Sequence, residues 1–142
     1  MDLKQLDTKT ASNEGRECVI KHPDTGLDTD IKITLAGMDS DLFQEMNDDL
    51  KREVREKLKR GKEFELTPDE ERDRDYERMV KATLGWSGVQ EDGVDLPFSP
   101  DTALRVYREI PVIFRQVLAF VGGEANFLPQ FKKSSSKGSK RS

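Results

Sequence analysis

The chain of 142 residues is short enough for one domain, and with 37% charged and 34% hydrophobic residues it predicts a modest core with large solvated helix faces. One cysteine excludes an intramolecular disulfide, and one histidine argues against catalytic triads and multi-histidine metal sites. No apolar run approaches the roughly 18 residues that span a bilayer, so we expect no membrane partner.

The first 36 residues predict a flexible lead followed by a β-hairpin. Residues 1–15 are polar and are expected to form the lead. In the hairpin, over 17–36, Pro23 and Gly26 supply the turn, and residues 30–35 alternate between polar and apolar types. Two strands alone are marginal in water, so the hairpin must pack on helices or pair with a strand of another chain.

Two highly charged helices are predicted next, over about 39–60 and 68–84. The charges of the first run from acidic to basic, which complements the helix dipole. The run Thr67-Pro68-Asp69-Glu70 has the residue types of a capping box and marks the start of the second helix. The apolar residues of the first helix recur every four positions in a narrow stripe: Leu42, Met46, Leu50, Val54 and Leu58.

The single tryptophan, Trp86, falls in a predicted connector over residues 85–99. Ser99-Pro100 then starts a helix over about 100–110, and Pro111 starts another over 111–122 that is apolar almost all round and therefore buried. Two interpretations of the connector remain open. Its aromatic side chains either fold onto the helices as a lid or form a docking surface.

Residues 132–142 form a basic tail with five Lys or Arg residues and no acid, which leaves a net charge of −9 on the rest of the chain. Their Ser/Lys composition is typical of a disordered segment, either a solubilising end or a linker. Because phosphate contacts need clustered basic residues, we expect no nucleic-acid partner for the acidic body. The predicted fold class is α+β, mainly helical: a single domain over 16–131 in which the hairpin packs on about four helices.

The sequence contains no recognisable catalytic set. There is no Gly-rich phosphate loop, and the run Glu91–Asp95 lacks the alternating ligands of a calcium loop. We therefore expect neither an enzyme nor a metal or organic cofactor, but a domain that binds protein. The candidate residues for protein binding, or for a structural clamp, are Trp86, Leu96, Pro97, Phe98, Ile113, Phe114, Val117, Phe120 and Phe127.

Several short motifs occur in a characteristic order. Residues 85–89 read GWSGV, residues 96–99 read LPFS, and Ile110-Pro111, Gln116-Val117 and Asn126-Phe127 follow. Together with the upstream runs 19–26 and 37–40, this order resembles the tail assembly chaperones of long-tailed bacteriophages over roughly residues 17–131.

The resemblance implies a protein of the host cell cytoplasm that is absent from the mature virion. It would bind the tape measure protein, keep that long helical chain soluble, and help recruit subunits of the major tail tube protein. A structural tail component retained in the virion and a small protein-binding regulator are the alternatives. The edge of the hairpin also offers a place for self-association.

Overall fold

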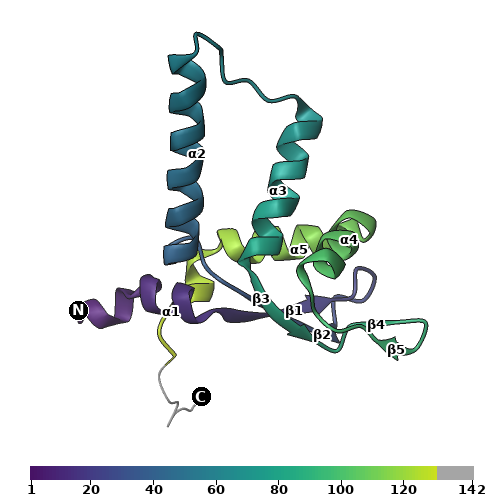
Figure 1. The fold of residues 1–142 in the computed structure, drawn as a ribbon. Coiled ribbons are helices and arrows are strands. Elements are labelled where there is room, and N and C mark those ends of the chain that lie inside the picture. The colour runs from purple at the N-terminus through teal and green to yellow at the C-terminus, as the bar shows by residue number, and fades with distance from the viewer. Residues whose placement is uncertain (131–142) are drawn as a thin grey trace.

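The computed structural model describes residues 1–130 as a small antiparallel sheet with one helix across it and two helices that project away from it (Figure 1). The predicted disorder of residues 132–142 lies outside this part of the chain. The elements are η1 (Leu3–Leu6), α1 (Thr8–Glu14), β1 (Arg16–Lys21), β2 (Asp28–Leu35), α2 (Asp41–Lys59), α3 (Pro68–Ala82), β3 (Thr83–Ser87), β4 (Gln90–Glu91), β5 (Val94–Asp95), α4 (Pro100–Glu109), α5 (Pro111–Gly122) and η2 (Glu124–Phe127).

The predicted fold class, α+β and mainly helical, is confirmed. Strands β1 and β2 form the expected hairpin, whose turn is closed by Gly26 at a φ of 72°. The helices begin close to the predicted positions, with α2 starting at Asp41 against a predicted start at about residue 39. Ser40 accepts a hydrogen bond from the backbone N–H of Phe43, and Thr67 and Glu70 form the full capping box.

The connector prediction needs one correction, because Trp86 lies on a strand and not on a loop. Helix α3 ends at Ala82, and β3 pairs antiparallel with β2, which places Trp86 opposite Ile33. The edge of β2 that β1 leaves free supplies the hydrogen-bond partners of β3. Just beyond β2, the backbone N–H of Ala36 also donates to the carbonyl of Ala82 at 2.8 Å. The sheet is therefore three-stranded with β2 in the middle.

The N-terminal prediction is also corrected, since residues 1–15 include a helix that contributes to the core. The Asp7 carboxylate accepts a hydrogen bond from the backbone N–H of Thr10 and caps α1. Ala11 and Ser12 are buried, and the carbonyl of Ser12 accepts from the N–H of Gly37 at 3.1 Å. The small side chains of Ala11 and Ser12 allow this close approach. Helix α1 is therefore stabilised by contacts with the rest of the fold, which its polar sequence does not indicate.

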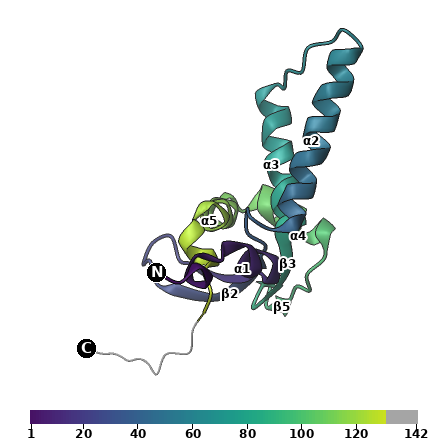
Figure 2. The same cartoon turned by 90° about the vertical axis from the view of Figure 1, so that its left-hand side faces the viewer.

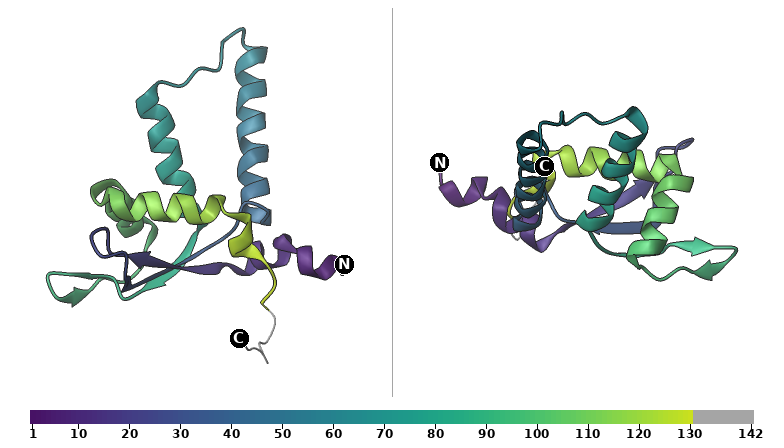
Figure 3. Two further views of the ribbon diagram at one scale, coloured as in Figure 1. Left: turned by 180° about the vertical axis from the view of Figure 1, so that it is seen from behind. Right: turned by 45° about the horizontal axis from the view of Figure 1, so that its top comes forward.

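The core lies between the sheet and helices α3, α4 and α5. Helix α5 contacts β1 and β2 and crosses the sheet, while α4 packs on α3 and α5 (Figures 1 and 3). At one end of β1 the Gln116 side chain of α5 accepts from the backbone N–H of Lys21 and donates to its carbonyl, both at 2.8 Å. The buried apolar residues of this core include Ile33, Leu35, Phe43, Tyr107 and Val117.

Helices α2 and α3 form an arm that rises from the body (Figures 1 and 2). Phe43, at its base, is the one fully buried residue of α2. Farther out, Arg74 of α3 makes a bidentate ion pair with Glu53 of α2, at 2.9 and 2.8 Å, and the Phe64 ring lies near Arg74 and Lys57. The two helices are thus joined by charged groups more than by apolar packing.

Candidate protein-binding surface

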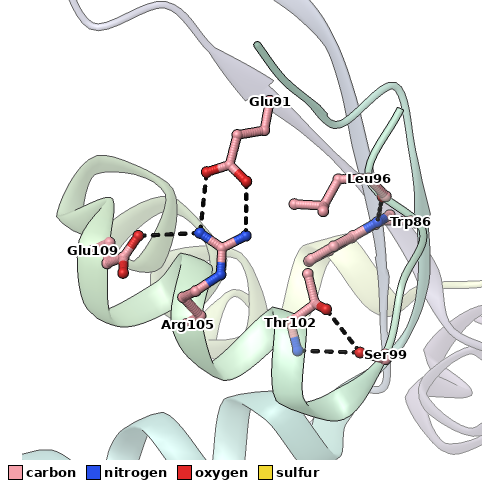
Figure 4. Close-up of polar contacts among 7 residues, drawn as sticks. All are labelled: Trp86, Glu91, Leu96, Ser99, Thr102, Arg105 and Glu109. Atoms are coloured by element: carbon pink, nitrogen blue, oxygen red, sulfur yellow. Dashed lines mark hydrogen bonds and ion pairs between the residues drawn. The ribbon is translucent and has the colours of Figure 1, made fainter. Parts of the chain in front are cut away.

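Trp86 holds the connector against the body of the protein. Its indole Nε1–H donates to the carbonyl oxygen of Leu96 at 2.8 Å, and its ring meets that of Phe98 edge-on, with centroids 5.3 Å apart and an interplanar angle of 83° (Figure 4). Leu96 in turn donates its N–H to the carbonyl of Val89. The side chains of Trp86, Leu96 and Phe98 are half-buried against the core, so this geometry supports the clamp interpretation.

Polar contacts attach the same connector to α4. Ser99 caps this helix by accepting from the N–H of Thr102 at 3.1 Å, and Arg105 reaches back to Glu91 in the β4–β5 ribbon at 2.9 and 3.1 Å (Figure 4). The hydrogen bond from Arg105 lowers the pKa of the Glu91 carboxyl. Arg105 also pairs with Glu109 at 3.2 Å. The Arg105 guanidinium therefore links the β4–β5 ribbon to helix α4.

Apolar side chains on the outer side of this clamp remain uncovered. Asp92 and Gly93, with φ of 53° and 79°, turn the chain between β4 and β5. Val94 in β5 is 68% exposed, and Pro97 is exposed as well. We name Val94, Leu96, Pro97 and Phe98 the connector surface.

The remaining candidate residues are either buried in the core or half-buried at its edge. Ile113 and Val117 of α5 are buried. Phe114 is half-buried, and its ring centroid lies 4.6 Å from that of Tyr76 in α3. At the far end of α5, half-buried Phe120 packs edge-on against buried Phe127, with centroids 5.4 Å apart. The candidates therefore form two groups, the connector surface with Trp86 and a separate set on α5 and η2.

Sequence reasoning missed a buried polar pair beneath the connector. Tyr107 of α4 is 0% exposed, and its hydroxyl lies 2.6 Å from Oγ1 of Thr83 at the start of β3. Since Thr83 donates to the carbonyl of Met79, the Tyr107 hydroxyl donates to Thr83. Burial raises the pKa of Tyr107 to about 12, so the hydroxyl remains a donor even at alkaline pH where an exposed tyrosine ionises.

Replacement of Trp86 by phenylalanine tests the clamp. The ring packing is largely kept, but the hydrogen bond to the Leu96 carbonyl is lost, so we expect the free energy of unfolding to fall by about 1 kcal/mol. Urea denaturation followed by circular dichroism measures the change. An unchanged midpoint would show that the indole N–H contributes nothing to holding the connector.

Within residues 1–130, no group of three or more His, Cys, Asp or Glu side chains is arranged to hold a metal ion. None of the helices described there has both the length and the apolar character needed to cross a membrane.

Comparison with known proteins identifies a family. Searches of curated proteins and of solved structures find no match. The family model described as YdaY prophage protein matches residues 38–138, a range that includes the arm, the connector and helices α4 and α5. The match covers more than half of the chain, and the protein therefore belongs to the YdaY prophage protein family.

Proposed function

We propose that this prophage protein is a tail assembly chaperone. It binds the tape measure protein in the host cytoplasm, keeps it soluble, and helps recruit tail tube subunits, without catalysing a reaction and without remaining in the virion. Membership of a prophage family supports the phage context, and the order of motifs over residues 85–127 favours the chaperone role.

The observation that carries this proposal is the connector surface. Val94 and Pro97 are exposed beside half-buried Leu96 and Phe98, and the clamp by Trp86 and Arg105 holds them on a defined backbone. A rigid strip of apolar side chains fits the apolar face of a client helix and hides it from water. Such shielding is what a long, aggregation-prone helical chain requires.

Co-expression with the tape measure protein of the same prophage tests the function. We expect the wild-type chain to raise the soluble yield of the client and to co-purify with it. Val94→Asp places a charge in the connector surface, and we expect it to weaken client binding at least about tenfold, equivalent to 1.4 kcal/mol. Binding is measured by titration of a soluble tape measure fragment.

Leu3→Asp is the matched control. Leu3 is also strongly exposed, but it lies in η1 at the opposite end of the molecule (Figure 1). This variant should bind the client like the wild type. Equal binding by both variants would remove the connector surface from the proposal, and no gain in client solubility with the wild type would refute the chaperone role. Mass spectrometry of purified particles distinguishes a chaperone, which should be depleted, from a retained structural component.

A further inference from the structure

Strand β1 has an outer edge whose two ends already have hydrogen-bond partners. β2 pairs with one side of β1, and the other side faces away from the sheet. At one end of this edge the Gln116 side chain bonds to both backbone groups of Lys21. At the other end the Gly15 N–H donates to the carbonyl of Ala11, and the Gly15 carbonyl accepts from the Arg16 guanidinium.

Between these two ends, Glu17 and Val19 direct their backbone groups away from the sheet. In a strand, the N–H and carbonyl of every second residue point to the same edge. The groups of Lys21 point outward, so those of Val19 and Glu17 point outward as well. The intervening Ile20 points inward, since its carbonyl accepts from the hydroxyl of Thr29 in β2. No loop, helix or side chain within residues 1–130 bonds to the four groups of Glu17 and Val19, which we call the open groups.

This edge is complementary to itself. In an antiparallel pair, residues directly opposite each other can exchange two hydrogen bonds. When two copies of β1 meet about a two-fold axis at Cys18, Glu17 of each copy lies opposite Val19 of the other, and all open groups find partners. In the same register Gly15 lies opposite Lys21, and neither residue needs a partner. An axis at Val19 would instead place the open groups of Glu17 against the occupied groups of Lys21.

The charged side chains beside the edge fit the same register. Glu17 and Lys21 are exposed on the uncovered face of the sheet, because buried Cys18 and Ile20 point to the opposite face. In the paired strands, the Glu17 carboxylate of one copy lies diagonally across from the Lys21 ammonium of the other, within reach of long side chains. Lys21 also pairs with Asp28 of its own chain, so the second carboxylate adds to an existing ion pair.

Helix α5 presents apolar side chains beside this edge. Gln116 reaches the outer side of β1, so the flank of α5 that carries Gln116 lies next to the edge. Val112 and Ala119 share that flank, four residues before and three residues after Gln116. Ala119 is exposed and Val112 is half-buried. A second copy at the edge would therefore meet uncharged side chains above the paired strands.

We propose that two copies of this chain form a two-fold dimer in which their β1 strands pair antiparallel about Cys18. The two sheets then join into one, in the order β3-β2-β1-β1-β2-β3. An isologous contact needs a surface that is complementary to itself, and the pattern of open and occupied backbone groups provides one. The pairing uses this edge in both copies, so growth on this side of the sheet stops at the dimer.

Val19→Pro tests the backbone pairing. Proline removes an N–H that points outward and leaves the pairing of β1 with β2 in place, which is the position that edge strands tolerate. Two of the four intermolecular hydrogen bonds are lost, so we expect the dimer dissociation constant to rise at least about tenfold. Light scattering over a concentration series measures it, starting from the 16.2 kDa monomer. Val19→Thr is the matched control, because it keeps the N–H and should dimerise like the wild type.

Charge exchange tests the register independently of the backbone. Glu17→Lys places two ammonium groups at each diagonal contact, and Lys21→Glu places two carboxylates there, so each variant alone should dimerise several-fold more weakly. An equimolar mixture of the two variants has opposite charges at both diagonals and should form a heterodimer as readily as the wild type forms its dimer. Both positions are exposed, so both variants should fold.

A wild type that stays monomeric at every concentration overturns the proposal, as does a mixture of the charge variants that fails to pair. A folded Val19→Pro variant that dimerises like the wild type also overturns it. Hydrogen exchange of the Glu17 and Val19 amides identifies other occupants. Protection in a monomer would assign the edge to a segment of the same chain, and protection only with a tape measure fragment would assign it to the client. The inference goes beyond the chaperone role, because the dimer is measured with the chain alone.

Discussion

Tyr107→Ala is expected to lower the free energy of unfolding by about 4 kcal/mol, which is the range for removing a large aromatic side chain from a packed core. Tyr107 is fully buried in α4, its ring lies 6.0 Å from that of Phe114, and its hydroxyl bonds to Thr83. The variant therefore creates a cavity where α4, α5 and the start of β3 meet. Urea denaturation followed by the fluorescence of Trp86, the single tryptophan, measures the loss.

Tyr107→Phe separates packing from hydrogen bonding. It keeps the ring and removes only the donor to Thr83, so we expect a loss of about 1 kcal/mol. Combining it with Thr83→Val gives a double-mutant cycle for the pair. If Tyr107→Phe cost as much as Tyr107→Ala, the hydroxyl and not the ring would dominate at this position.

Gly88→Ala is expected to destabilise the fold by about 3 kcal/mol or more, through two costs at one residue. Gly88 follows β3 with a φ of 75°, which side chains other than hydrogen disfavour, and an added Cβ would lie 2.0 Å from the carbonyl oxygen of Asp30. Because that contact is to backbone of β2, the sheet itself must shift. Thermal unfolding and urea titration both report the effect.

Gly93→Ala is the matched control, because Gly93 has a similar φ of 79° but no atom within 4 Å of the added Cβ. Gly93→Ala should lower the free energy of unfolding by only about 1 kcal/mol, which is the cost of placing a side chain on a residue with positive φ. Similar losses in the two variants would show that the close approach of Gly88 to Asp30 is relieved at no cost.

The elements that sequence reasoning predicts correctly are those with local signals. Thr67 and Ser99 each accept a hydrogen bond from the backbone of their own first helical turn, so their residue types mark the helix starts. Ser40 caps α2 in the same way, although the adjacent Asp39 is an equally suitable residue type. β3 has no such signal. Thr83–Ser87 becomes a strand because β2, almost fifty residues earlier, offers a free edge, and only the folded chain brings the two together.

In the candidate site, too, some features have a local signal in the sequence and others do not. The sequence places Trp86 and Phe98 in one short connector, but the edge-on contact between their two rings is found only in the structure. The Arg105–Glu91 bridge could not be predicted, because the chain has 28 acidic and 24 basic residues and spacing alone does not choose among them. The buried Thr83–Tyr107 pair was missed for a related reason: Tyr107 reads as one more apolar residue of an amphipathic helix.

The contact between Gln116 and Lys21 has a consequence for aggregation. β1 is an outer strand of the sheet, and unpaired backbone groups on such a strand invite pairing with other chains. The Gln116 amide donates to and accepts from one residue of β1, as the peptide group of a neighbouring strand would. At that end of β1 the backbone N–H and carbonyl of Lys21 are therefore already paired and are not open to an incoming strand.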